Sequence, residues 1–248
     1  MQYRFRAGGY SPGIFPKGVK WLLIVNAAVF GVDFFAQNWF EADLFWLFRL
    51  VPDHVLHHGM FWQLATYMFL HGNVWHILFN MLFLWMLGVD LERDWGTRRF
   101  LNYYFLCGIG AGVCVVLAAL LRPEEMRSPT LGASGAVLGV LLAYGVVYAD
   151  RIILFMLMFP MKAKYVAMIY GAIAFFGSWQ PGSRVSHVAH LGGMVFGYLY
   201  LKMGLKRIRS HPLGWLRRQL QEWKRQRARR KFQVEMKKQH WDRDRWMN

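Results

Sequence analysis

LGASGAVLG, at residues 131–139, opens an apolar run that continues to about residue 149 with almost no charge. Ser134 is a small hydroxyl flanked by small residues where a helix is expected to begin. The N–H groups of a first helical turn are free to bind a negative charge, and small neighbours leave room beside the hydroxyl. Gly135 and Gly139 form a G-x-x-x-G pair, which alone is more typical of close helix packing than of catalysis. A partner histidine elsewhere would favour the catalytic interpretation.

Hydrophobic residues make up 56% of the 248 residues and charged residues 18%, whereas an average soluble domain carries about 25% charged residues. The apolar residues come in blocks of about 20, the length of a helix that crosses a bilayer. We therefore predict an all-α membrane protein, a bundle of six transmembrane helices with a partly embedded first loop at residues 39–73. The expected spans are residues 19–38, 74–91, 99–121, 132–149, 163–178 and 187–204.

This assignment divides the chain into an N-terminal arm at residues 1–18, a membrane domain at residues 19–204 and a basic amphipathic tail at residues 205–248. Sixteen Lys and Arg residues lie between positions 202 and 245. Basic segments mark the cytoplasmic side of a membrane, so we expect both termini in the cytoplasm, with a bacterial inner membrane as the setting. Anionic lipid headgroups are the expected partner of the tail, and nucleic acid is not expected.

Several smaller features receive structural interpretations. Cys107 and Cys114 are expected to be inert buried thiols within one span. His54, His57 and His58 lack a further ligand nearby, so we expect surface histidines and no metal site. Other expectations are an interfacial Asp33, a charged turn from Glu92 to Arg99, and a lipid-facing re-entrant segment at residues 152–161.

Span two carries His76 and Asn80, which are four residues apart and share one face of the helix. Polar side chains within a membrane are costly unless they have partners. The pair is therefore either a polar clasp between helices or a pair of donors that face a cavity.

Span six begins SHVAHLGGMVFG at residues 186–197, where His190, Gly193 and Gly197 share one face. Glycine faces allow helices to approach closely, and span four offers such a face at the same depth. Docking the two faces would bring His190 to Ser134, where a neutral imidazole can take the hydroxyl proton. His76 and Asn80 would then be placed to stabilise an oxyanion.

These motifs, in this order, resemble those of the rhomboid intramembrane serine proteases of the six-span bacterial type. GASG at residues 132–135 matches the family's G-x-S-G, and AHLGGMVFG at residues 189–197 matches A-H-x-x-G-x-x-x-G. HILFN at residues 76–80 matches H-x-x-x-N. The resemblance implies Ser134 as nucleophile, His190 as base, and an oxyanion hole made by His76, Asn80 and the N–H of Ser134. It also implies a structural role for His71.

The chain departs from the family in two places and offers a rival base. Trp62-Gln63 stands where the family has Trp-Arg, which puts the stability of the first loop in question. Leu138 stands where an aromatic ring often stacks on the base. His187 lies three residues before His190, but the glycines that follow His190 favour His190 as the base.

The expected activity is hydrolysis of peptide bonds in the transmembrane segments of membrane-protein substrates, by a Ser-His dyad without a metal or organic cofactor. The alternative is a non-catalytic relative that binds or escorts membrane clients. The sequence does not indicate the natural substrate, the oligomeric state, the element that admits the substrate, or the role of the tail.

Overall fold

The structure is a computed structural model that describes residues 15–155, 158–178 and 187–209. Most of the predicted arm and tail, and the loop before span six, lie outside these residues. The chain divides into two compact units, Met1–Leu201 and Lys202–Asn248, and the site described below lies in the first.

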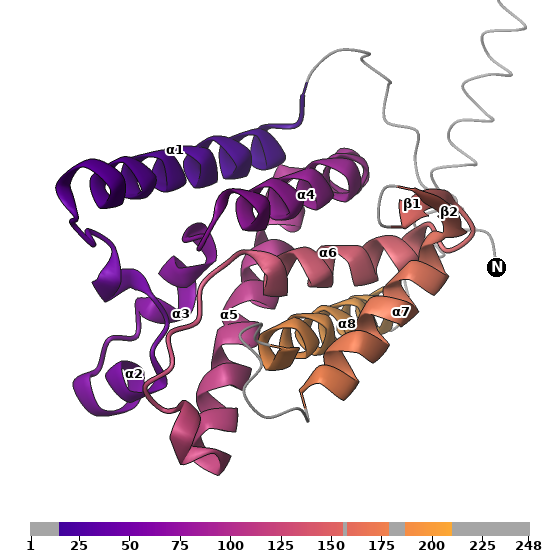
Figure 1. Ribbon diagram of the computed structural model, residues 1–248. Coiled ribbons are helices and arrows are strands. Elements are labelled where there is room, and N and C mark those ends of the chain that lie inside the picture. Colours follow the sequence, from indigo (N-terminus) through magenta and orange to yellow (C-terminus); the bar gives the residue numbers. More distant parts are fainter. Residues whose placement is uncertain (1–14, 156–157, 179–186, 210–248) are drawn as a thin grey trace, which may run out of the picture. The chain divides into compact units, whose positions relative to one another are not determined.

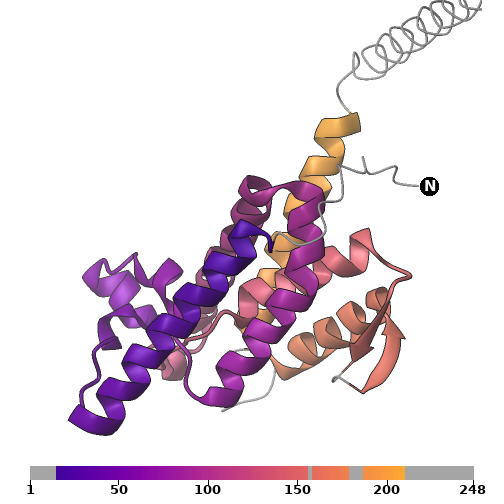
Figure 2. The same cartoon turned by 90° about the horizontal axis from the view of Figure 1, so that it is seen from above.

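Within the described residues, three helices are long and apolar enough to cross a membrane: α1 (Lys17–Phe40), α4 (Val74–Trp95) and α5 (Thr97–Leu121). They lie at the predicted positions, although α4 continues four residues beyond the expected end. Seen from above in Figure 2, α1 runs beside α4. Helices satisfy every backbone hydrogen bond internally, which is why apolar segments of this length adopt them in lipid.

Two shorter apolar helices, α6 (Ser134–Val147) and α7 (Ala163–Gly177), and a longer one, α8 (His187–Arg209), complete the bundle. Figure 1 shows α6 between α4 on one side and α7 and α8 on the other, and α6 also packs against α5. Many residues of α6 are buried, as its small side chains allow. The protein is thus a helical bundle, and the number of membrane crossings stays a prediction.

The first loop, predicted at residues 39–73, contains four short helical segments. They are η1 (Trp46–Phe48), α2 (Pro52–His58), α3 (Gln63–Thr66) and η2 (Tyr67–Phe69). The fully buried Gln63 accepts a hydrogen bond from the N–H of Val51 at 3.0 Å and donates one to the carbonyl of Leu47 at 3.0 Å. Gln63 therefore connects two segments of the first loop, at the position where the resemblance implies an arginine.

The connection between α6 and α7 differs from the predicted re-entrant segment. It forms an antiparallel hairpin of β1 (Ile152–Phe155) and β2 (Phe159–Lys162), in which Ile152 pairs with Lys162. The hairpin satisfies the backbone of an apolar stretch that is too short for a helical span. A further short element, η3 (Pro123–Glu125), follows α5.

Two acidic residues of the apolar helices are buried. Glu92, expected in a charged turn, is 2% exposed near the end of α4. Its carboxylate accepts hydrogen bonds from the N–H groups of Gly18 and Val19, both at 2.7 Å, and so caps the start of α1. Asp33 is 8% exposed, and its place at the membrane interface stays a prediction.

Candidate active site

Ser134 is the first residue of α6 and follows a backbone turn that requires glycine. Gly132 has φ of +118°, a value that side-chain-bearing residues rarely adopt. Its N–H donates to the carbonyl of Tyr67 at 2.9 Å, which anchors the turn to the first loop. Ser134 therefore presents its hydroxyl beside N–H groups that have no partner within the helix.

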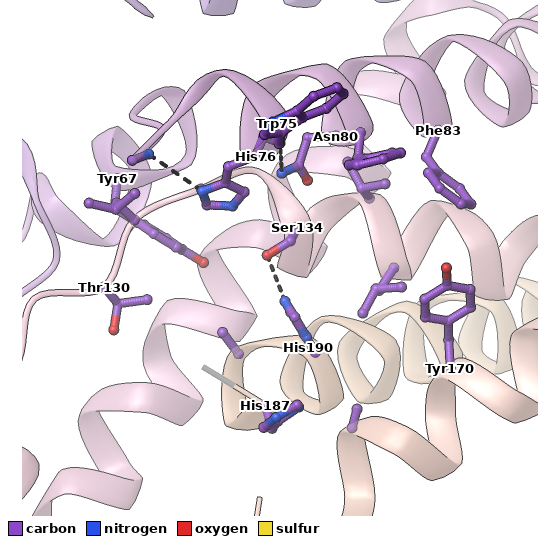
Figure 3. A pocket seen from close by; sticks show the side chains of 18 of the residues that line it. Tyr67, Trp75, His76, Asn80, Phe83, Thr130, Ser134, Tyr170, His187 and His190 are labelled. Carbon is purple, nitrogen blue, oxygen red and sulfur yellow. Dashed lines mark hydrogen bonds between the residues drawn. The ribbon is translucent and has the colours of Figure 1, made fainter. Parts of the chain in front are cut away.

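His190 on α8 and Ser134 on α6 are brought together by the fold. Nε2 of His190 lies 2.7 Å from Oγ of Ser134, and Figure 3 shows the two side chains pointing toward each other. When Nε2 is unprotonated, the serine hydroxyl can donate to it. This is the arrangement that a nucleophile and its general base need.

Glycines make this approach possible. A Cβ on Gly193 of α8 would collide with the carbonyl oxygen of Gly135 on α6. A Cβ on Gly139 would lie 3.1 Å from the carbonyl oxygen of Gly193 and 2.5 Å from Sγ of Cys107 on α5. Gly197, which was expected to face span four, instead lies against Tyr103 and Cys107 of α5.

Tyr103 of α5 forms a hydrogen bond with the backbone of α6. Its buried hydroxyl donates to the carbonyl of Gly139 at 2.7 Å and lies where a side chain at Gly197 would clash. The helices α5, α6 and α8 therefore pack around this hydrogen bond, at a residue five positions after Ser134 in α6. Cys107 is buried beside the bond as expected, whereas Cys114 is only partly buried; neither forms a disulfide bond among the described residues.

His76 lies against the turn that precedes the serine. A Cβ on Gly132 would be 2.7 Å from Cε1 and Nε2 of the His76 ring. The N–H of Gly72 lies 3.4 Å from Nδ1 of His76, so a neutral ring carries its proton on Nε2, toward Gly132. Asn80 is 7% exposed and donates from Nδ2 to the carbonyl of His76 at 2.8 Å.

A cavity of about 900 Å³ is lined by the four candidate site residues, His76, Asn80, Ser134 and His190. It reaches from the turn at Gly72 to an aromatic end where Phe83 and Tyr170 meet with ring centroids 6.0 Å apart (Figure 3). Phe79 and Phe83 were not singled out from the sequence, although they share the helix face of His76. The lining residues include Tyr67, Gly72, His76, Phe79, Asn80, Phe83, Ser134, Leu138, Tyr170, His187 and His190.

His71 precedes α4 and is 4% exposed, with its ring centroid 5.1 Å from that of His76. Burial, followed by the proximity of His76, lowers the pKa of His71 to about 3. The ring is therefore neutral near pH 7 and supports His76 by edge-to-face contact.

Within the part of the chain that the structure describes, no three His, Cys, Asp or Glu side chains are grouped closely enough to hold a metal ion. His54, His57 and His58 lie on α2, where His57 contacts Asp53 at 2.8 Å. They contribute nothing to the cavity.

Comparison with known proteins identifies the family to which the chain is similar. Residues 58–207 match the family model of the Rhomboid domain. The chain is 29% identical over 187 residues to Rhomboid protein 1, mitochondrial, of Saccharomyces cerevisiae, covering 75% of this chain and 53% of that protein.

Two bacterial relatives are named as proteases. Rhomboid protease AarA of Providencia stuartii is 30% identical over 57% of this chain and 55% of its own length. Rhomboid protease GluP of Bacillus subtilis is 28% identical over 61% of this chain and 27% of its own length. The chain thus spans about half the length, or less, of these relatives.

Proposed function

The chain belongs to the rhomboid family, and we propose that this integral membrane protein is a serine endopeptidase that cleaves transmembrane segments of membrane-protein substrates. The observation that supports the proposal most directly is the 2.7 Å distance between Oγ of Ser134 and Nε2 of His190. An alcohol in contact with an imidazole, inside a cavity, is suited to acyl transfer.

In the proposed reaction, Oγ of Ser134 attacks the carbonyl carbon of the scissile bond while its proton passes to Nε2 of His190. The imidazolium then gives this proton to the leaving amine, and an acyl-enzyme remains. Water, deprotonated by the same imidazole, attacks the ester, and the proton returns to Oγ as the serine leaves.

The negative oxygen of each tetrahedral intermediate requires hydrogen-bond donors. The N–H of Ser134 lies in the first turn of α6, and Nε2–H of His76 and the amide of Asn80 face the same cavity. We assign these three groups to the oxyanion hole. A donor of this kind contributes about 3 kcal/mol to transition-state stabilisation.

A helical substrate hides its carbonyls in i to i−4 hydrogen bonds, so the cleaved segment must unwind before it is attacked. Substrates with Gly or Pro near the cut are expected to react faster, because these residues weaken helices. A small residue before the scissile bond follows from the resemblance to the family.

The test is cleavage of a reporter transmembrane segment by the purified full-length protein. Ser134→Ala and His190→Ala should each abolish cleavage, whereas Ser128→Ala, at an exposed loop serine, should not. Cleavage by Ser134→Ala at the original rate would refute the assignment. A wild-type protein that captures the reporter without cutting it would support the alternative, client binding without catalysis.

Orientation and compartment belong to the same proposal. We place both termini in the cytoplasm of a bacterial cell, with the basic tail against anionic headgroups of the inner leaflet. A single cysteine added to the arm should react with a membrane-impermeant maleimide in inverted vesicles and not in intact spheroplasts. The opposite pattern would reverse the orientation.

A further inference from the structure

His187 is a partly buried imidazole that the proposed reaction does not use. It lies one helical turn before His190 and lines the same cavity, but it is His190 that contacts Ser134. Nδ1 of His187 is buried and has no hydrogen-bond partner among the described residues. A polar ring in this position needs another reason to be there.

The two rings meet edge to face. The centroids of His187 and His190 are 6.0 Å apart and their planes are at 89°. Perpendicular packing at this distance is the favourable arrangement for aromatic rings. In Figure 3 His187 lies on the side of His190 that faces away from Ser134.

The other side of His187 is closed by α7. A Cβ on Gly177, the last residue of α7, would lie 2.5 Å from Cγ of His187 and 2.6 Å from Cδ2 and Nδ1. The ring therefore rests directly on bare backbone. His187 fills the space between the end of α7 and His190, and only glycine at position 177 leaves room for it.

The remaining surroundings of His190 provide little to orient its ring. Among the described residues that line the cavity there is no Asp or Glu, so none of them offers a carboxylate to orient the imidazole. Leu138, one turn after the serine, is aliphatic and gives no directional ring contact. Among the described ring contacts, His187 is the aromatic partner of His190.

We propose that His187 is a positioning residue: its ring, braced by the bare backbone of Gly177, holds the His190 imidazole in the orientation that accepts the Ser134 proton. The inference rests on the proposed function, since it assigns a purpose to His187 only if His190 is the base. His187 does not touch the reacting atoms, and the shape of its ring matters more than its nitrogens.

The first test replaces the ring and then removes it. His187→Phe keeps an aromatic edge, so kcat should stay within about threefold of the wild type. His187→Leu keeps apolar volume without a ring, and His187→Ala removes both, so both should lower kcat about fivefold to tenfold with KM changed less than twofold. Equal kcat for the Phe and Leu variants would overturn the proposal, as would complete inactivity of His187→Phe, which would make His187 the base.

The second test substitutes Gly177, the residue of α7 that contacts the His187 ring. Gly177→Ala should push the His187 ring and lower kcat in the wild-type background. In the His187→Ala background, where the space is empty, the same change should have little effect on kcat. Full additivity of the two losses would mean that the residues act independently and would overturn the inference.

Two controls separate the possible failures. Thermal unfolding of each purified variant shows whether a loss of kcat reflects a loss of fold, and the Phe–Leu comparison remains decisive if His187→Ala does not fold. If Ser134→Ala cleaves the reporter at the wild-type rate, the proposed function fails. If Ser134→Ala is inactive but His187→Leu behaves as the wild type, only the positioning role fails.

Discussion

The carbonyl oxygen of Gly135 on α6 occupies the space that a Cβ on Gly193 of α8 would need. The backbones of the two helices therefore touch at this point, one residue beyond Ser134 and three residues beyond His190. The distance between the two catalytic candidates is set by this crossing, because each side chain projects from a helix whose position the crossing fixes.

Gly193→Ala should separate α6 from α8. We expect loss of cleavage by at least about a hundredfold and a decrease of about 1–3 kcal/mol in the free energy of unfolding, as overpacked sites show. The control is Gly31→Ala on α1, where a Cβ meets nothing within 4 Å. Cleavage rate and thermal unfolding should both be unaffected in the control, and a fully active Gly193→Ala protein would contradict the close crossing.

Gly132→Ala should impair the oxyanion hole. The substitution places a methyl group 2.7 Å from the His76 ring and strains a backbone with φ of +118°. Since loss of one oxyanion donor lowers kcat about 10²–10³-fold, Gly132→Ala and His76→Ala should show similar losses in kcat. Steady-state kinetics on the reporter measures this. An unchanged kcat in Gly132→Ala would show that His76 does not depend on this turn.

Glu92→Ala should weaken the attachment of α1 to α4. Besides the N–H groups of Gly18 and Val19, the carboxylate accepts a hydrogen bond from Oγ1 of Thr97 at 2.6 Å. We expect a loss of about 2–4 kcal/mol, because buried donors lose a charged partner. The matched control, Glu125→Ala, removes a partly exposed carboxylate that pairs with Arg122 at 3.5 Å and should cost far less. Unfolding in detergent micelles compares the two.

His71 should make the protein less stable in acid. Its folded pKa of about 3 lies below the value near 6.5 of a free imidazole, so only the unfolded state takes up this proton between these pH values. Stability therefore decreases as the pH falls from about 6.5 toward 3. In His71→Gln the decrease in stability between pH 7 and pH 5 should be smaller than in the wild type. An unchanged slope in His71→Gln would contradict the assignment.

Membership of the rhomboid family was predicted from three short motifs and is confirmed by the match over residues 58–207. The helical membrane fold is confirmed as well, because long apolar blocks have few alternatives in lipid. The helix starts at residues 74 and 163 agree with the prediction, since polar or proline-containing segments precede both.

Other features could not be predicted because they depend on distant parts of the chain. The sequence around Glu92 shows a charged cluster, and nothing local indicates that this carboxylate caps a helix 74 residues earlier. The segment at residues 152–161 is apolar in either a lipid-facing or a hairpin conformation, so hydropathy does not distinguish them. Gly197 shares a face with Gly193, but it meets α5 because α8 passes between two helices.

The proximity of Ser134 and His190 was predicted from the sequence, but their catalytic role is a proposal. The spacing of glycines predicted that His190 would approach Ser134, and the two side chains lie in contact. Proteolysis by this pair of side chains stays a prediction. The bracing of His187 by Gly177 could not have been foreseen, because it depends on where α7 ends relative to α8.

The hairpin between α6 and α7 also has a mechanical consequence. Its paired strands end directly at Ala163, so the first turn of α7 continues from the hydrogen-bonded strand β2. If α7 tilts while the hairpin stays paired, the tilt is centred at Ala163. Gly177, at the other end of the helix, is about 21 Å away along the helix axis. A tilt of a few degrees would then move Gly177 by more than an ångström and leave Ala163 nearly in place. The gap between α7 and α8 would widen most beside His187 and His190.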